Sequence, residues 1–330
     1  MTKVLLTKKF YSKDLEYIKS GLDAGIHLID PQEYTEAALL IKCSDVKALL
    51  GAFISERLLE ESKNLELIQI PWTGVDKLDY ETLNKFDIHV CNSHSNGNAV
   101  AEMAIALFLS AVKGVVYHDN QLRKGFWNRP TPDNSNSYSP FSREISKMNI
   151  GILGYGSIGR AIHKMLGGLC SNFSILTHSG IGSNEGVTYF EKSNEQEFYE
   201  NIDCLFVCLP LTSKTLGYVN EQKLKWMKKG SFLVNTARGS VINEKDLFNV
   251  LEEKHLEGAA IDTWWQGPSA KDEFHPSEFP FRSLDHVVMS PHRAGMIQGS
   301  LPHLDDVIKN LNNLHRGLSL INKVNIKDKY

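Results

Sequence analysis

The sequence lacks the features that mark several large classes of protein. Its five cysteines are an odd number with no Cys-x-x-Cys pair, which argues against a disulfide framework and against a zinc site. Lysine plus arginine (36) and aspartate plus glutamate (39) nearly cancel, so no basic excess attracts nucleic acid or a membrane surface. The first apolar run is too short for a signal peptide or a membrane span. We therefore predict a reduced, cytoplasmic protein that uses neither metal nor nucleic acid.

What the sequence does contain is a regular alternation of apolar runs and helical stretches. Its 330 residues, 42% of them hydrophobic, are enough for two globular domains. In the first part a helix is expected at 11–20, and strands are expected at 4–6, 38–41, 67–70 and 88–91. A second series predicts strands at 150–153, 174–177, 204–208, 232–235, 259–262 and 287–289. This alternation predicts parallel sheets with helices packed on them.

Two further segments indicate how these domains are connected. A run rich in Ala, Leu, Glu and Met predicts one long helix over 99–124, and a Pro-, Asn- and Ser-rich loop follows it. A last helix expected at 304–320 would return to the first domain. We therefore predict a discontinuous domain, 1–98 with 296–330, around a continuous domain, 99–295.

A glycine motif predicts that the continuous domain, 99–295, binds a dinucleotide and that the discontinuous one is the substrate domain. Gly154, Gly156 and Gly159 form a G-x-G-x-x-G directly after an apolar strand and at the start of a predicted helix. The first glycine permits the tight turn, the second lets a pyrophosphate approach the backbone, and the third lets helix and strand pack closely. With Tyr155, Ser157 and Ile158 these glycines are expected to bind the phosphates at the helix N-terminus.

The residues about 20 positions further on bear on the choice of cofactor. An acidic residue there would bind the ribose hydroxyls and repel a 2′-phosphate. The strand instead ends in Thr177, His178, Ser179 and Gly180, and no arginine or lysine stands beside them. We expect His178 and Ser179 at the ribose, with a small preference for NADP, while NAD remains open.

Seven motifs in a fixed order give the sequence a specific resemblance. They are Trp72-Thr73-Gly74-Val75-Asp76, Asn96-Gly97-Asn98-Ala99-Val100-Ala101-Glu102, the glycine motif, Leu209-Pro210-Leu211-Thr212, Asn235-Thr236-Ala237-Arg238-Gly239, Ala260-Ile261-Asp262 and Ser290-Pro291-His292. Together they span nearly the whole sequence, which resembles the D-isomer-specific 2-hydroxyacid dehydrogenase family. The resemblance implies a Rossmann-type doubly wound parallel sheet and a smaller, flavodoxin-like α/β substrate domain. It also implies a homodimer, formed through the helix expected at 99–124 and the adjoining loop.

The resemblance implies the catalytic residues. Hydride transfer to a 2-oxo acid needs a site for the carboxylate, a cation near the carbonyl and a proton donor. Arg238 follows a predicted strand and resembles the family arginine that holds the carboxylate and the carbonyl oxygen with its planar set of donors. His292, after the last predicted strand, resembles the family histidine that gives and takes the proton.

The remaining implied contacts fall into two groups. The backbone of Thr73, Gly74 and Val75 would receive the substrate carboxylate, and Asn96 would point toward it. Cofactor-lining positions are implied for Leu209, Pro210, Thr236, Ala237, Asp262 and Ala294, with Asp262 near the nicotinamide carboxamide. For several of these residues, turn formation or strand-end packing is a competing explanation.

The sequence departs from the family pattern at one important position. The family pairs its histidine with a glutamate five residues after the strand aspartate, where this chain has Gly267. Gln266 could orient His292 through a neutral hydrogen bond, as in the related formate dehydrogenases, which would move the pH optimum downward. Alternatively, Asp272 or Glu273 could fold back, or the pair is lost and catalysis is weak. We favour Gln266 slightly.

These observations lead to one main expectation and two alternatives. The main one is an oxidoreductase that transfers a hydride between NAD(P)H and a small 2-oxo or 2-hydroxy acid. The alternatives are an enzyme similar to formate dehydrogenase, prompted by Gln266, and a dinucleotide-sensing protein without turnover, prompted by the missing glutamate. The retained Arg238 and His292 count against the second alternative.

Overall fold

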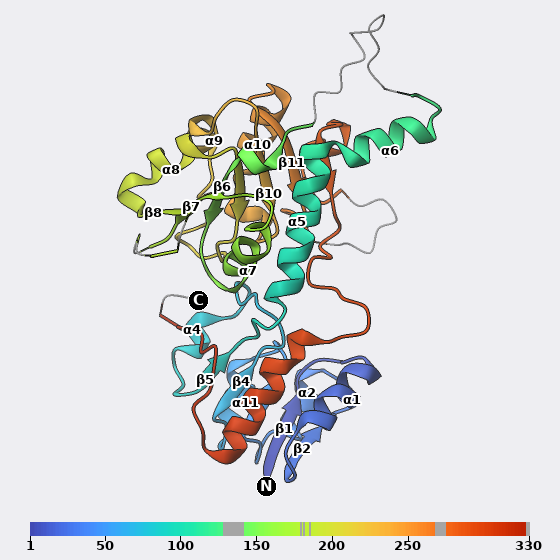
Figure 1. Ribbon diagram of the computed structural model, residues 1–330. Coiled ribbons are helices and arrows are strands. Elements are labelled where there is room, and N and C mark those ends of the chain that lie inside the picture. Colours follow the sequence, from blue (N-terminus) through green and yellow to red (C-terminus); the bar gives the residue numbers. More distant parts are fainter. Residues whose placement is uncertain (128–141, 179, 181, 185, 268–274, 328–330) are drawn as a thin grey trace, which may run out of the picture. The chain divides into compact units, whose positions relative to one another are not determined.

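The computed structural model describes residues 1–127, 142–178, 180, 182–184, 186–267 and 275–327. The chain forms two compact units, and each is treated separately below. Unit 1 comprises Met1–Asn96 with Ile297–Tyr330, and unit 2 comprises Gly97–Met296. Figure 1 gives the element labels used from here on.

Unit 1 is built on a five-stranded parallel sheet with the order β2-β1-β3-β4-β5. Its strands are β1 (Thr2–Leu6), β2 (Ile26–Ile29), β3 (Ala48–Leu50), β4 (Leu67–Gln69) and β5 (His89–Cys91). Its helices are α1 (Ser12–Gly21), α2 (Glu36–Leu40), α3 (Glu56–Glu61), α4 (Tyr80–Leu83), the 3-10 turn η5 (Pro302–Leu304) and α11 (Asp305–Arg316). This strand order is that of flavodoxin-like folds and confirms the predicted fold class.

The core of unit 1 lies on both faces of this sheet. Leu39, Leu58 and Leu83 bring α2, α3 and α4 onto one face, whereas Ile18 and Leu311 bring α1 and α11 onto the other. The C-terminal helix therefore packs in the same unit as the first strand. It ends at Arg316, earlier than expected, because Gly317 adopts a left-handed φ of 68°.

Unit 2 is built on a seven-stranded parallel sheet with the order β12-β11-β10-β9-β6-β7-β8, the doubly wound Rossmann arrangement. Its strands are β6 (Asn149–Leu153), β7 (Asn172–Leu176), β8 (Val187–Phe190), β9 (Cys204–Val207), β10 (Ser231–Asn235), β11 (Leu256–Ile261) and β12 (Val287–Met289). Its helices are α5 (Gly97–Lys113), α6 (Val115–Arg123), α7 (Ser157–Leu166), α8 (Glu195–Asn201), α9 (Glu221–Trp226) and α10 (Glu244–Glu252). Short 3-10 turns are η1 (Ile145–Lys147), η2 (Lys192–Asn194), η3 (Gly239–Val241) and η4 (Phe281–Ser283). Helices α5 and α7 cover one face of the sheet, and α8, α9 and α10 cover the other.

The long helix expected at 99–124 is wrong in one respect. Gly114 takes a left-handed φ of 61°, and the chain there divides into α5 and α6, bent by 63°. Figure 1 shows α5 along the strands of unit 2 and α6 turning away from it. No single helix in the described part of the chain is long and apolar enough to cross a membrane.

The strand predictions were wrong at one place and incomplete at three others. Residues 38–41 belong to helix α2 and the turn after it, because the Thr35 hydroxyl accepts a hydrogen bond from the Ala38 N–H and starts a helix. Strands β2 and β8 were missed because they are sheet edges whose residues are mostly half-buried or exposed, so they lack an apolar run. Strand β3 was also missed, although its three residues are all buried.

Candidate active site

The glycine motif forms an anion-binding turn between β6 and α7. Gly154 has a left-handed φ of 94°, and a Cβ at Gly159 would lie 2.4 Å from the Gly154 carbonyl oxygen, so both positions require glycine. A Cβ at Gly156 would meet nothing within 4 Å, so this position faces open space. Within the described residues, the N–H groups of Gly156, Ser157 and Ile158 donate no hydrogen bond. These free donors fit the phosphates of a dinucleotide.

The end of β9 lies against the same turn. A Cβ on Gly154 would lie 3.0 Å from both the Cys208 carbonyl oxygen and Leu209 Cδ2, so Leu209 borders the glycine turn as expected for a cofactor-lining residue. The Tyr155 hydroxyl hydrogen-bonds His163 Nδ1 at 2.6 Å, so its ring packs along α7. Burial raises the pKa of the Cys208 thiol to about 12, so it is protonated at neutral pH and is no nucleophile.

An acid that was not predicted from the sequence lies near the residues expected at the ribose. His178 is exposed after β7, and Ser179 lies outside the described residues. Glu191 follows the neighbouring strand β8, and its Cβ lies 2.8 Å from where a Cβ on Gly180 would stand. A hollow beside it is lined in part by Gly180, Tyr189 and Glu191. The acid comes from the next strand along the sheet, and β8 itself gave no sequence signal.

The loop that carries Arg238 is held by a buried asparagine at the end of β10. Asn235 is fully buried; its Oδ1 accepts the Ala237 N–H at 3.1 Å, and its Nδ2 donates to the Arg238 carbonyl at 3.1 Å. The half-buried Arg238 guanidinium donates from Nη1 to the Ala237 carbonyl at 2.7 Å. A Cβ at Gly239 would lie 2.3 Å from the backbone of Trp264, so this glycine lets the loops after β10 and β11 touch.

The loop that carries His292 is fixed by the carboxylate of Asp262, which follows β11. This fully buried carboxylate accepts hydrogen bonds from the Ser290 hydroxyl at 2.5 Å, the Arg293 N–H at 2.8 Å and the Ala294 N–H at 3.1 Å. The His292 N–H donates to the Asp262 carbonyl at 2.9 Å. His292 has a left-handed φ of 55°, which costs free energy in a residue with a side chain and marks a backbone held in place.

Strand order brings these loops together. β10, β11 and β12 are neighbours in the sheet and run parallel, so their carboxyl ends lie at one edge. Arg238, Asp262 and His292 follow these three strands in turn. Arg238 and His292 thus stand on fixed loops at the same carboxyl edge, after strands that are separated only by β11. An arginine and a histidine so placed suit an acid–base reaction on an anionic substrate.

The expected partner of His292 is not in contact with it in the described part of the structure. Gln266 is exposed, and its backbone N–H donates to the Pro276 carbonyl at 3.0 Å, but its side chain makes no hydrogen bond to His292. Asp272 and Glu273 lie outside the described residues.

The tryptophans after Asp262 have a packing role. The Trp264 indole N–H donates to the Ser290 carbonyl at 2.9 Å, and that of Trp265 donates to the Ile242 carbonyl at 2.8 Å. Trp265 also stacks on Phe281, with ring centres 5.4 Å apart. These contacts hold the segment after β11 against Ser290, Ile242 and Phe281.

In unit 1, the loops after β4 and β5 are joined by their side chains. The Thr73 hydroxyl donates to the Ser93 carbonyl at 2.7 Å and lies 3.2 Å from Asn96 Oδ1, and Asn92 Nδ2 donates to the Thr73 carbonyl at 2.6 Å. No N–H group of residues 73–75 donates a hydrogen bond to any described residue. Three neighbouring free donors are of the kind that can bind a carboxylate. Asn92 and Ser93 were not predicted, although both follow an apolar strand.

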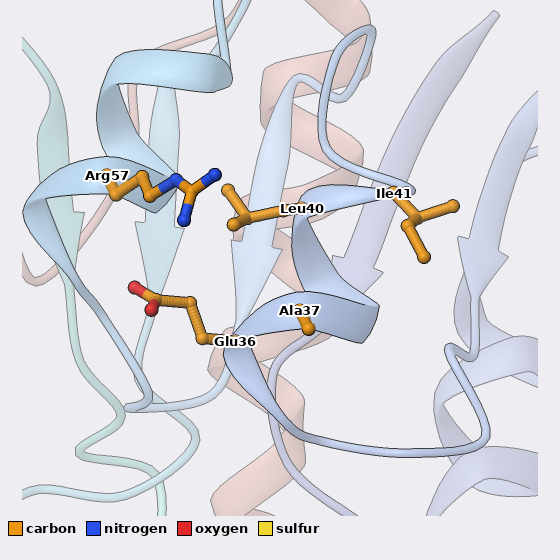
Figure 2. A pocket seen from close by; sticks show the side chains of 5 residues that line it. All are labelled: Glu36, Ala37, Leu40, Ile41 and Arg57. Carbon is orange, nitrogen blue, oxygen red and sulfur yellow. The ribbon is translucent and has the colours of Figure 1, made fainter.

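The described residues hold no other concentration of reactive side chains. They contain no group of three or more His, Cys, Asp or Glu side chains placed to bind a metal. A hollow between α2 and α3 is lined by Glu36, Ala37, Leu40, Ile41 and Arg57. Figure 2 shows Arg57 reaching toward Leu40 across this hollow, while Ile41 points away. None of the predicted site residues lines it.

Comparison with known proteins agrees with this geometry. Residues 105–294 match the family model described as D-isomer specific 2-hydroxyacid dehydrogenase, NAD binding domain. A glyoxylate reductase from Thermofilum pendens is 30% identical over 303 residues, which cover 88% of this chain and 85% of that protein.

Two solved structures share the fold over the full length of both chains. A probable 2-hydroxyacid dehydrogenase from Rhizobium etli, in complex with NADP, HEPES and L(+)-tartaric acid, gives a TM-score of 0.81 at 21% identity, with 100% of each chain covered. The NADPH-dependent glyoxylate/hydroxypyruvate reductase of Sinorhizobium meliloti, in complex with NADP and sulfate, gives 0.80 at 19% identity, again with 100% of each covered.

The family model spans more than half of the chain, and it covers the glycine turn and the loops after β10, β11 and β12. The chain therefore belongs to the family of D-isomer specific 2-hydroxyacid dehydrogenases, NAD(P)-dependent oxidoreductases that act on small 2-oxo and 2-hydroxy acids.

Proposed function

We propose that this enzyme reduces glyoxylate or a similar small 2-oxo acid, with Arg238 as the substrate-binding cation and His292 as the acid–base residue. The observation that carries the proposal is the anchoring of the His292 loop by Asp262, at the same edge of the sheet as the loop that holds Arg238. The Thermofilum relative, a glyoxylate reductase, supports the choice of substrate.

The reaction follows from the chemistry of these side chains. A reduced nicotinamide cofactor, held by the glycine turn, would supply the hydride. The Arg238 guanidinium binds the carboxylate and the carbonyl oxygen, and it stabilises the negative charge that develops on that oxygen. His292, protonated, donates its proton to the same oxygen, which yields the 2-hydroxy acid. In the reverse direction His292 takes the proton from the hydroxyl.

Further contacts are proposed from the loops in each unit. The free N–H groups of Thr73, Gly74 and Val75, with Asn96, bind the substrate carboxylate. Cofactor contacts are proposed for Leu209, Pro210, Thr236, Ala237, Ala294 and Asp262, which here also holds the His292 loop. Orientation of His292 by Gln266 finds no support among the described contacts, and neither does a function similar to formate dehydrogenase, which rested on that residue.

For the cofactor we propose a preference for NADP(H). The absence of an acid directly after β7 supports this, and the Rhizobium and Sinorhizobium proteins were solved with NADP. Glu191 acts against it, since its carboxylate near Gly180 would repel a 2′-phosphate. We therefore expect use of both cofactors, with NADPH preferred.

A cytoplasmic homodimer is the proposed form of the enzyme. Val115, Val116 and Leu122 on α6, with Phe126 and Trp127 after it, are all more than 40% exposed, an apolar surface that fits a second copy. Light scattering should give twice the 37.1 kDa chain mass, and the chain mass itself would refute this proposal.

The catalytic proposal is tested by following NADH and NADPH absorbance with glyoxylate, hydroxypyruvate and pyruvate, in the wild type and in His292→Ala. We expect oxidation in the wild type that falls by about 10²–10⁴-fold in the variant. His27→Ala, at an exposed histidine of unit 1, is the control and should keep wild-type rates. Cofactor binding without turnover on any of these acids would favour the dinucleotide-sensing alternative.

A further inference from the structure

Unit 1 holds a lysine between two aromatic rings directly after β1. Lys8 Nζ lies 4.8 Å from the ring centre of Phe10 and 5.0 Å from that of Trp72. Phe10 is 7% exposed and Trp72 37%, so one ring forms the floor of this arrangement and the other reaches its surface. A positively charged ammonium near an aromatic ring is attracted electrostatically by the electrons of the ring face. We call Lys8, Phe10 and Trp72 the lysine cradle.

The backbone of the sheet makes room for this lysine. Strand β3 lies between β1 and β4, and Gly51 follows β3. A Cβ at Gly51 would lie 2.5 Å from Thr7 Oγ1 and 3.1 Å from Lys8 Cγ, and its φ of 137° is one that side chains rarely adopt. The missing side chain therefore lets the Lys8 stem cross the end of β3 and reach the ring of Trp72.

The Lys8 ammonium has no acidic partner among the described residues. No carboxylate of the described residues lies within ion-pair distance of its ammonium, and none of them accepts a hydrogen bond from it. Desolvation lowers the pKa of Lys8, and the more distant Asp14 only partly opposes this. Its three N–H donors are thus available, and an anionic ligand would supply the charge that the fold does not.

The lysine cradle adjoins the proposed carboxylate receptor. Trp72 directly precedes Thr73, Gly74 and Val75, whose N–H groups are free, and its own carbonyl accepts the Ser93 N–H at 3.2 Å. The ring against Lys8 and the free amides thus belong to one short segment at the carboxyl end of β4. An acid held on these amides would have its remaining atoms close to this cationic surface.

We propose that Lys8 is a specificity-determining residue that binds a second anionic group, carboxylate or phosphate, on the substrate. This rests on the proposed function, since it takes the first carboxylate to lie on residues 73–75. It implies that 2-oxo acids with a second acidic group are better substrates than glyoxylate or pyruvate.

The test compares kcat/KM for acids with one and with two anionic groups. Glyoxylate and pyruvate form the first set; oxaloacetate, 2-oxoglutarate and the phosphate ester of hydroxypyruvate form the second. Within the second set, the first two acids carry a second carboxylate and the third carries a phosphate, so their rates show which group Lys8 prefers. The variants are Lys8→Met, which keeps the apolar stem, and Lys8→Arg, which keeps the charge. Lys9→Met is the matched control, because Lys9 is exposed and makes no ring contact in the described structure. Melting temperatures confirm that each variant folds.

We expect Lys8→Met to lower the ratio of dianion to monoanion kcat/KM by about tenfold to a hundredfold, mainly through KM. Lys8→Arg should retain most of that ratio, and Lys9→Met should leave it unchanged. An equal loss for every substrate, or a wild type that turns over monoanions with no preference for dianions, would overturn the inference and leave the proposed function standing.

A wild type without turnover on any acid would instead count against the proposed function. In that case, tryptophan fluorescence during a titration with 2-oxoglutarate tests separately whether Lys8 binds an anion. A saturable change in the wild type that Lys8→Met loses supports an anion site at Lys8. The same titration curve in both proteins, or no change in either, overturns it.

Discussion

The two units share a design but hold their functional loops differently. In unit 2, the loops after β10 and β12 are fastened to fully buried polar side chains, Asn235 and Asp262. In unit 1, the loops after β4 and β5 are fastened to each other through Thr73 and Asn92, and three backbone donors are left free. A group that transfers a proton needs a fixed position, whereas a group that receives a carboxylate needs free donors. Under the proposed function, this difference assigns the proton transfer to unit 2 and the binding of the substrate carboxylate by backbone donors to unit 1.

The largest effect is expected from Asp262→Asn. The asparagine amide cannot accept every hydrogen bond that the carboxylate accepts from Ser290, Arg293 and Ala294, so the loop that carries His292 loses its position. We expect a loss of about 1–3 kcal/mol in the free energy of unfolding, and a fall in kcat larger than the change in KM. Urea unfolding and steady-state kinetics measure both.

Asp203→Asn is the matched control for that variant. Asp203 accepts the Asn149 N–H at 2.7 Å at the amino end of β6, the edge of the same sheet away from the site loops. It should lower stability and leave kcat at the wild-type value. If both aspartate variants reduce kcat alike, the special role of Asp262 and the comparison built on it are wrong.

A smaller effect is expected from Thr73→Val in unit 1. The valine keeps the shape of the side chain but removes the hydroxyl that donates to the Ser93 carbonyl. The loss of one hydrogen bond, about 1 kcal/mol, should raise KM for the acid roughly fivefold while kcat stays close to the wild-type value. A fall in kcat with unchanged KM would contradict the assignment of recognition to unit 1.

The smallest effect concerns stability in acid and applies to both units. Burial lowers the pKa of four histidines from the ordinary value of 6.5: His94 and His303 in unit 1, and His163 and His286 in unit 2. Below pH 6.5 the unfolded chain therefore binds protons that the folded chain does not. The free energy of unfolding should fall as the pH drops from 7 to 5.5 and stay nearly level above 7.

The free energy of unfolding of His94→Gln, measured over the same pH range, tests the contribution of one of these histidines. The imidazole of His94 meets Asn92 Oδ1 at 2.9 Å, beside the loops of unit 1, and Asp306 only partly offsets the lowering of its pKa by burial. With this titrating group removed, the acid-induced loss should become shallower. A wild-type stability that rises on acidification would show that these histidines do not control it.

The fold could be predicted from sequence where residues act locally. The glycine turn was predictable because the need for each glycine arises from contacts within a few residues. Most central strands were predictable because they are continuous apolar runs, although the central strand β3 was missed. Strands β2 and β8 were not predictable, since edge strands bury little and carry no such run. The break at Gly114 was missed because a single glycine can also be tolerated inside a helix.

The site was predictable only as far as its motifs reach. Arg238 and His292 stand in recognisable motifs after strands, but the role of Asp262 as the support of the His292 loop depends on contacts between residues about 30 positions apart. Glu191 could not be found because it follows the edge strand β8, which gave no sequence signal. Lys8 could not be found because it meets Trp72, which follows a strand two places along the sheet and far along the chain. Spatial adjacency across a parallel sheet is the information that a sequence pattern lacks.

The central claim is that the loops after β10 and β12 bind and reduce the 2-oxo acid. The most direct test is to measure the kinetics of Arg238→Lys together with the dissociation constant of the cofactor. Lysine keeps the charge but loses the planar pair of donors that holds a carboxylate. The account predicts that kcat/KM for glyoxylate falls about a hundredfold, which corresponds to the loss of a charge-assisted pair of hydrogen bonds, while cofactor affinity changes little. Wild-type kcat/KM in this variant, or an equal loss of cofactor binding, would contradict it.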